Sequence, residues 1–158
     1  MGNNLGEQPS NAPLDPNTLG VLKGCQVTFA AQNCGDLVHG AAVWNNGCGV
    51  TNGTVDVQVN TSGLYLFSCQ VIFSTSGTGT RDVIIWKYGS PNTIVSSDSR
   101  PPNDGQFGAF SITTFTDQIL VDNTQPSFKV QTSATNGSSQ QATVVSGKLT
   151  ITRIGRVS

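Results

Sequence analysis

Charged side chains are scarce in this sequence. Asp, Glu, Lys and Arg make up 11% of its 158 residues, against about 25% in a typical soluble domain. The 8 basic and 9 acidic residues leave a formal net charge of -1, and no basic residue lies between Lys23 and Arg81. Binding to nucleic-acid phosphates needs clustered Lys and Arg. We therefore expect no nucleic-acid partner.

Long hydrophobic runs are also missing. No apolar stretch approaches the roughly 20 residues that are needed to cross a bilayer. The first residues, Met-Gly-Asn-Asn-Leu-Gly-Glu, lack both the cationic segment and the apolar segment of a secretory signal. We expect no membrane insertion and no export by the secretory route.

Groups that perform acid–base or nucleophilic chemistry are few. The chain has one histidine, His39, one glutamate and eight scattered aspartates, and His39 has no hydroxyl nucleophile close to it in the sequence. We interpret His39 as a structural residue and the aspartates mainly as turn residues. The sequence therefore predicts a protein that is not an enzyme and has no catalytic residue.

Metal-binding patterns are absent as well. The four cysteines, at positions 25, 34, 48 and 69, form no Cys-x-x-Cys pair, and no calcium-loop pattern is present. We expect no metal and no cofactor. Cys25 and Cys69 fall on apolar faces of predicted strands, where a thiol behaves as a small hydrophobe. Cys34 and Cys48 fall in loops rich in Gly and Asn, and whether they pair is left open.

Alternation of apolar and polar residues is the dominant pattern. Ser, Thr, Asn and Gln supply 58 residues, and many alternate with Val, Ile and aromatic residues, as a half-buried strand requires. The turn Thr61-Ser62-Gly63 between two such segments indicates a hairpin, and Ser76-Gly77-Thr78-Gly79-Thr80 indicates a second. No long helix is apparent. The predicted strands are 25–31, 37–45, 55–59, 64–73, 82–88, 93–97, 107–116, 118–122, 127–134 and 142–154.

About ten short strands at this spacing predict an all-β fold of two antiparallel sheets, a sandwich or jelly roll. Aromatic and aliphatic residues on one side of these strands belong either to the core or to an interface between subunits. Trp86 and Tyr88 share one face of their strand, and a carbohydrate-stacking platform is a further reading of that pair. The residues assigned to the core or to an interface between subunits are Tyr65, Phe67, Phe73, Trp86, Tyr88, Phe110, Leu149 and Ile151.

Residues 1–22 differ from the rest of the chain. They contain three prolines among Asn, Gly and Asp, with too few apolar residues to face a core. We divide the chain into this segment and a folded domain over 23–158. The segment is either a disordered terminus or an extended arm that becomes ordered against a neighbouring subunit. Its candidate anchoring residues are Leu5, Pro9, Pro13, Leu14, Pro16 and Leu19.

Two motifs carry a resemblance to a known family. The segment Gly63-Leu64-Tyr65-Leu66-Phe67 resembles the Gly-x-Tyr-x-Phe signature of C1q-like domains. The final strand, Val145-Ser146-Gly147-Lys148-Leu149, looks like the closing Phe-Ser-Gly-x-Leu strand of that family, with Val145 in place of Phe. The resemblance covers about residues 25–155. It implies the C1q/TNF-like jelly roll of ten strands in two sheets and assembly as a homotrimer.

The sequence that precedes the domain favours one group of C1q-like proteins. No collagen-like Gly-x-y repeat precedes it, which fits the C1q-like and TNF-like modules of bacteriophage and other virus particles. We expect a non-enzymatic virion protein on the particle surface, assembled in the host cytoplasm. It would be a trimeric capsid decoration or head-fibre module that binds capsid or fibre proteins through its arm. The alternative is the tip of a viral or phage fibre that binds a host-surface glycan or protein receptor.

Overall fold

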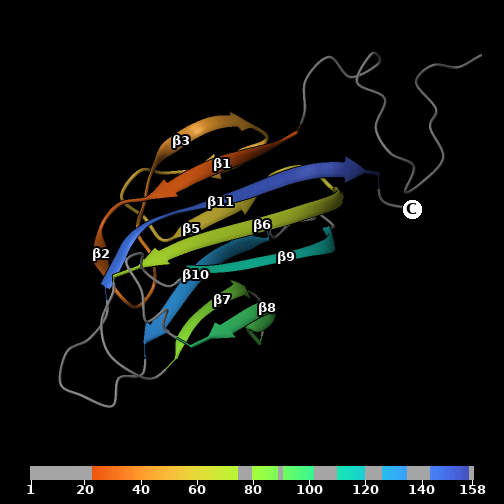
Figure 1. Ribbon diagram of the computed structural model, residues 1–158. Coiled ribbons are helices and arrows are strands. Elements are labelled where there is room, and N and C mark those ends of the chain that lie inside the picture. Colours follow the sequence, from red (N-terminus) through yellow and green to blue (C-terminus); the bar gives the residue numbers. More distant parts are fainter. Residues whose placement is uncertain are drawn as a thin grey trace, which may run out of the picture.

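The structure, a computed structural model, consists of strands joined by loops (Figure 1). It describes residues 23–74, 80–88, 91–101, 110–119, 126–134 and 143–156, and for 110–115, 117 and 118 it describes the backbone alone. The strands in these ranges are β1 (Gly24–Phe29), β2 (Gln32–Asn33), β3 (His39–Asn46), β4 (Cys48–Val50), β5 (Asp56–Val59), β6 (Gly63–Phe73), β7 (Arg81–Lys87), β8 (Thr93–Arg100), β9 (Phe110–Ile119), β10 (Ser127–Ala134) and β11 (Thr143–Gly155).

The strands form two antiparallel sheets. Sheet A has the order β3-β1-β11-β6-β9, with the two-residue β2 also paired to β11, and sheet B has the order β4-β5-β10-β7-β8. In Figure 1 the strands of sheet A run side by side, and β1 begins at the end of the sheet where β11 ends, in agreement with the pairing of Gly24 and Thr152. The predicted all-β, two-sheet jelly roll is confirmed. The proposed arm over 1–22 lies outside the described residues.

The core lies between the two sheets and follows from the alternation in the sequence. Along β6 every second residue, from Gly63 to Phe73, is buried, while its neighbours are half-buried or exposed. Successive side chains of a strand point to opposite faces, so one face of β6 packs inward. Phe67 of sheet A meets Phe128 of sheet B with 4.7 Å between ring centroids. This contact joins the two sheets at the centre of the sandwich.

The two predicted hairpins are wrong. Strand β5 belongs to sheet B and β6 to sheet A, so the turn at Thr61-Ser62-Gly63 carries the chain from one sheet to the other. The strands on either side of the segment 76–80, β6 and β7, likewise belong to different sheets. Turn residues indicate that the chain reverses direction. They do not indicate whether the following strand pairs with the preceding strand or joins the opposite sheet.

One strand also replaces two predicted ones. The sequence predicts separate strands at 107–116 and 118–122, whereas β9 runs without a break from Phe110 to Ile119. Its pairing with β6 is continuous from Gly63 opposite Ile119 to Ile72 opposite Phe110. The polar residues near position 117 suggested a turn, but a long partner strand supplies hydrogen bonds along the whole segment.

Candidate functional site: two exposed sheet faces

The outer face of sheet A carries few charged residues on its central strands. Its three central strands, β1, β11 and β6, turn their polar and remaining apolar residues away from the core. Lys148 is the one charged residue among the outward positions of these strands. We define the sheet A face as these outward positions: Gln26, Thr28, Leu64, Leu66, Ser68, Gln70, Ile72, Val145, Ser146, Lys148, Thr150, Thr152 and Ile154.

Apolar side chains stand at both ends of the sheet A face. Leu66 and Ile72 are each 36% exposed and Val145 is 48% exposed. The register places Ser146 opposite Ile72 and Thr152 opposite Leu66, so the apolar positions flank a polar middle. In that middle, Gln26 Nε2 donates a hydrogen bond of 2.9 Å to Thr150 Oγ1. The face therefore combines exposed apolar area with uncharged polar groups.

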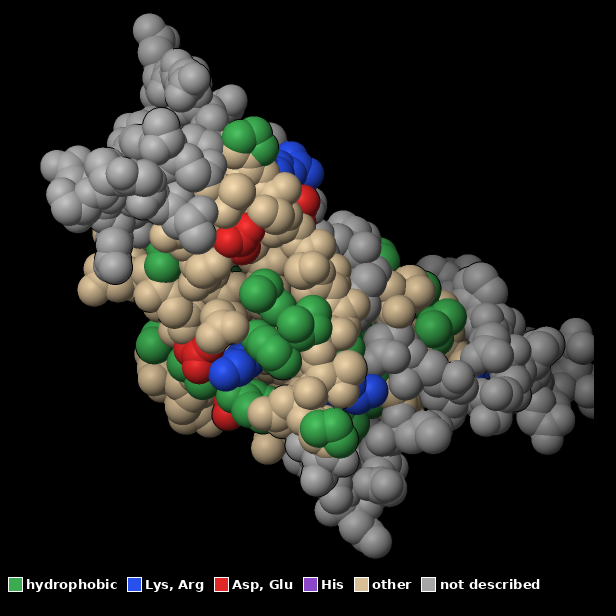
Figure 2. All heavy atoms as spheres, turned by 90° about the horizontal axis from the view of Figure 1, so that it is seen from below, with side chains coloured by type: hydrophobic (Ala, Val, Ile, Leu, Met, Phe, Trp, Pro, Cys, Tyr) green, Lys and Arg blue, Asp and Glu red, His purple; other side chains and the backbone are tan. Residues whose placement is uncertain are grey.

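The outer face of sheet B has a different character. We define the sheet B face by Ile84 and Trp86 of β7, Ile94 of β8, and Lys129 and Gln131 of β10. Ile94 is 49% exposed, and Trp86 Nε1 donates a hydrogen bond of 2.9 Å to Gln131 Oε1, which fixes the plane of the indole ring. Figure 2 views the molecule from the side where β7 and β8 lie in Figure 1 and shows hydrophobic side chains gathered next to acidic and basic ones.

Charged groups border the hydrophobic residues of the sheet B face. Lys129 Nζ lies 2.8 Å from Asp36 Oδ2 and 5.4 Å from the centre of the Tyr88 ring. Ser133 Oγ donates a hydrogen bond of 2.8 Å to Asp82 Oδ2. Removing such groups from water costs free energy unless the partner surface replaces their solvation. Sheet B is therefore the less suitable of the two faces for burial against a second copy.

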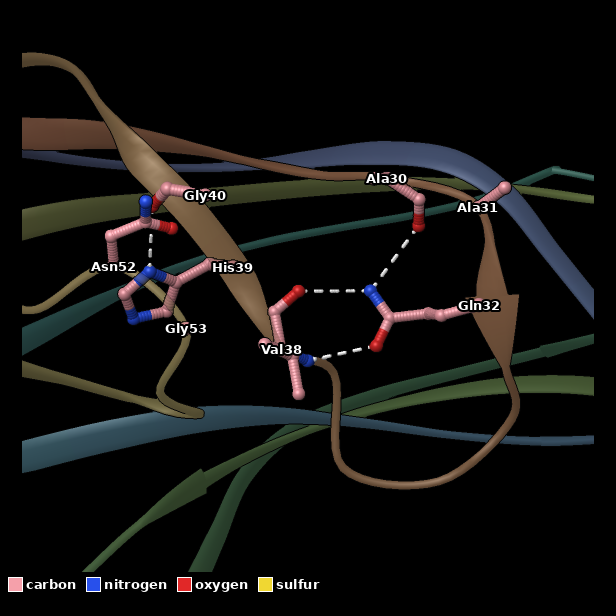
Figure 3. A pocket seen from close by; sticks show the side chains of 8 residues that line it. All are labelled: Ala30, Ala31, Gln32, Val38, His39, Gly40, Asn52 and Gly53. Atoms are coloured by element: carbon pink, nitrogen blue, oxygen red, sulfur yellow. Dashed lines mark hydrogen bonds between the residues drawn. The ribbon is translucent and has the colours of Figure 1, made fainter.

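A pocket of about 350 Å³ lies where β1 ends and β3 begins (Figure 3). The Gln32 side chain closes one wall, since its Nε2 donates to Val38 O and its Oε1 accepts from Val38 N, both at 2.9 Å. His39 is 2% exposed, and its Nδ1 and Nε2 lie 2.9 Å from Gly40 O and 3.0 Å from Asp56 O. The lining residues are Ala30, Ala31, Gln32, Val38, His39, Gly40, Asn52 and Gly53.

The pocket has little capacity for chemistry. None of its eight lining residues carries a carboxylate, an amine, a hydroxyl or a thiol. Both ring nitrogens of His39 face backbone carbonyls, so the ring is engaged in holding β3 and β5 together. The burial and the hydrogen bonds of His39 agree with a structural role for this residue.

Two further features are absent from the part of the chain that the structure describes. It contains no group of three or more His, Cys, Asp or Glu residues arranged to hold a metal ion. It contains no helix long and apolar enough to cross a membrane.

The residues predicted for the core or a trimer interface separate into three groups. Trp86 and Tyr88 are half-buried on the outer side of sheet B, and β9 begins at Phe110, whose side chain lies outside the described residues. The anchoring residues from Leu5 to Leu19 also lie outside the described residues. The remaining five are buried between the sheets: Tyr65, Phe67, Phe73, Leu149 and Ile151.

The sequence-based reasoning missed the exposed apolar residues of sheet A. Leu66 and Ile72 lie on the same strand as Tyr65, Phe67 and Phe73, each one position away from buried neighbours. The sequence does contain a signal for these residues, namely apolar side chains at outward positions, because a half-buried strand normally places polar residues on its outer side. An apolar residue at such a position is a candidate contact for another molecule.

The four cysteines differ in burial and in their neighbours. Cys25 and Cys69 are 1% and 0% exposed, as predicted. Cys48 is not in a loop but begins β4, where it is 7% exposed. None of the four cysteines is in a disulfide. The thiol near Cys48 is that of Cys25, whereas Cys34 lies near Thr132 and Arg81.

Comparison with known proteins identifies the fold. No protein-family model and no curated protein sequence matches the chain. Solved structures do match: murine APRIL at pH 5.0, with a TM-score of 0.60 and 15% identity, covers 84% of this chain and 100% of its own. The globular domain of zebrafish complement 1qA, with a TM-score of 0.61 and 12% identity, covers 86% and 99%. The fold is a C1q/TNF-like jelly roll.

Proposed function

We propose that this C1q/TNF-like domain is a non-enzymatic assembly module in which three copies associate through the sheet A face. The observation that carries the proposal is the single charge, Lys148, among the outward positions of β1, β11 and β6. Association there removes Leu66, Ile72 and Val145 from water while desolvating almost no charge. The threefold arrangement is the one that the resemblance to C1q-like domains implies, and a closed ring leaves no unpaired copy of the face.

A matched pair of substitutions tests the interface. Leu66 on sheet A and Ile94 on sheet B are both aliphatic, exposed and located on strands. We expect Leu66→Glu to weaken self-association by more than about tenfold, because a buried unpaired carboxylate costs free energy. Ile94→Glu should associate as the unchanged protein does. Sedimentation velocity at micromolar concentration measures both, and circular dichroism confirms that each variant is folded.

Each outcome of this experiment either supports or overturns the sheet A interface. A trimer that Leu66→Glu dissociates and Ile94→Glu preserves supports the sheet A interface. An unchanged chain that sediments as a monomer overturns the trimer. A trimer that only Ile94→Glu dissociates assigns the interface to sheet B and overturns the proposed face.

The biological setting that we propose for this trimer is the surface of a virus particle. In this proposal the folded domain projects outward as a capsid decoration or head-fibre module, and residues 1–22 dock on capsid or fibre proteins. An extended segment can contribute backbone hydrogen bonds to a sheet edge of its partner. The low charge of the domain and the absence of an acid–base pair in its pocket support a structural role.

Immunogold electron microscopy tests this setting. An antibody raised against residues 23–158 should label the outside of intact particles produced by the cells that make the chain. A chain that lacks residues 1–22 should still form trimers and should fail to label when added to stripped particles. Label restricted to unassembled protein would contradict the virion assignment without affecting the sheet A interface.

The sheet B face favours a second candidate function, recognition of a host-surface glycan. The Trp86 ring is half-buried and oriented by Gln131, as a stacking platform for a sugar ring requires. Trp86→Ala should abolish binding on a glycan array, whereas Trp86→Phe, which keeps a flat ring, should retain most of it. An array without any bound glycan would remove this candidate.

A further inference from the structure

Two cysteine side chains meet across the gap between the sheets. Cys25 belongs to β1 of sheet A and Cys48 to β4 of sheet B, and both point into the core. Their thiols lie within hydrogen-bonding distance of each other, and this contact together with burial raises the pKa of Cys25 far above its usual range. Cys69 is separated from Cys25 by strand β11, and its register partner there is Leu149.

The backbone fixes this pair through a tight connection. Cys25 pairs with Asn45 of β3. The Asn45 side chain in turn holds both backbone groups of Cys48, since Nδ2 donates to Cys48 O and Oδ1 accepts from Cys48 N, each at 2.9 Å. Between them Gly47 adopts φ of 112°, and its carbonyl accepts from Asn60 N at 3.0 Å. The chain therefore crosses from sheet A to sheet B between Asn45 and Cys48, and this crossing places Cys48 beside Cys25.

We propose that Cys25 and Cys48 are the site of a disulfide that ties sheet A to sheet B when the chain meets an oxidising small-molecule disulfide. This inference goes beyond the proposed assembly function and does not depend on it. One cysteine thiolate attacks the small disulfide and releases one of its halves as a thiol. The second cysteine then attacks the mixed disulfide, so the Sγ–Sγ bond forms and the other half leaves as a thiol. Two protein thiols are oxidised and one small disulfide is reduced.

Burial determines when this exchange takes place. Cys48, 7% exposed, is more accessible to a small-molecule disulfide than Cys25, 1% exposed. Cys48 is therefore the residue that reacts first, either during folding or when β4 opens locally. Once formed, the bond closes the loop from Cys25 to Cys48 and restricts the unfolded chain. For a loop of this length the unfolding equilibrium constant should fall by roughly 3 × 10²-fold.

The test is to refold the full chain in a mixture of reduced and oxidised glutathione, alkylate the remaining thiols and map the peptides by mass spectrometry. Trypsin alone is unsuitable, because no Lys or Arg lies between Lys23 and Arg81 and all four cysteines stay in one peptide. Chymotrypsin separates them by cutting after Phe29, Trp44 and Phe67. The expected product links the Cys25 and Cys48 peptides, with Cys34 and Cys69 alkylated.

Stability measurements complete the test. The oxidised chain should unfold at a higher urea concentration than the reduced chain, and reducing agent should abolish the difference. Cys69→Ser, the matched control for another buried thiol, should keep this shift and Cys48→Ser should lose it. If Cys48→Ser does not fold, the peptide map and the reducing-agent comparison of the unchanged chain remain decisive. Alkylation of both Cys25 and Cys48, or a bond from either to Cys34 or Cys69, would overturn the proposal.

Discussion

The side chain of Arg153 lies directly against the backbone of Gly63. A Cβ atom added at Gly63 would meet Arg153 Nε and would stand 2.9 Å from its Cγ and 3.0 Å from its Cδ. These atoms belong to the middle of the Arg153 side chain, so they cannot swing away as a flexible end would. The lack of a side chain at Gly63, at the start of β6, therefore leaves room for the Arg153 side chain near the end of β11.

A double-mutant cycle should measure this contact. Gly63→Ala should lower the free energy of unfolding by about 1–3 kcal/mol, because the added methyl group overpacks the site. In an Arg153→Ala background the same change should cost at least about 0.5 kcal/mol less. Urea unfolding at one fixed protein concentration provides the four values, since self-association would otherwise shift them. Strictly additive losses would show that the two residues do not constrain each other.

The aromatic alternation of β6 illustrates how much of the fold is local information. Tyr65, Phe67 and Phe73 could be assigned to one face, and the structure buries all three. The strand periodicity also predicted the all-β fold class and the division of the chain into short strands. Period-two patterns depend on neighbouring residues alone, which is why they are readable without knowledge of the fold.

The pairing of strands that are distant in the sequence could not be predicted from such local patterns. The turn before β6 looks like a hairpin turn, yet β5 and β6 lie in opposite sheets. The proximity of Cys48 to Cys25 depends on the pairing of β1 with β3 and on the crossing to sheet B. Such contacts are set by the packing of the whole sandwich, and no local pattern of residues specifies them.

His39 provides a second stability prediction. His39→Phe keeps an aromatic ring but removes the ring N–H, which donates to the carbonyl of Gly40 or to that of Asp56 depending on the tautomer, so a part-buried carbonyl loses its partner. The free energy of unfolding should fall by about 1–3 kcal/mol in urea titrations. Asn52→Ala, an exposed change in the same pocket wall, should stay within about 0.5 kcal/mol of the unchanged protein. Equal stability of all three proteins would mean that water replaces the histidine bond.

Tyr65 makes the fold sensitive to alkali. Burial raises the pKa of its hydroxyl to about 12, although the positive charge of Arg153 acts in the opposite direction. An unfolded tyrosine ionises near pH 10. Between about pH 10 and 12 the unfolded chain therefore releases a proton that the folded chain keeps, and by linkage the free energy of unfolding falls as the pH rises. Below pH 10 the contribution is fully present.

Tyr65→Phe should separate this effect from other alkaline changes. The variant loses the hydrogen bond of 2.7 Å from Tyr65 Oη to Thr61 O, so at pH 8 it should be less stable by about 1 kcal/mol. Burial also raises the pKa of Cys69 to about 12, and this thiol destabilises both proteins equally above its ordinary value. The unchanged protein alone loses the Tyr65 contribution, about 2 kcal/mol by pH 12, so the urea-derived stabilities of the two proteins should converge above pH 10 and then cross. Curves that stay parallel over this range would show that the Tyr65 hydroxyl does not couple folding to pH.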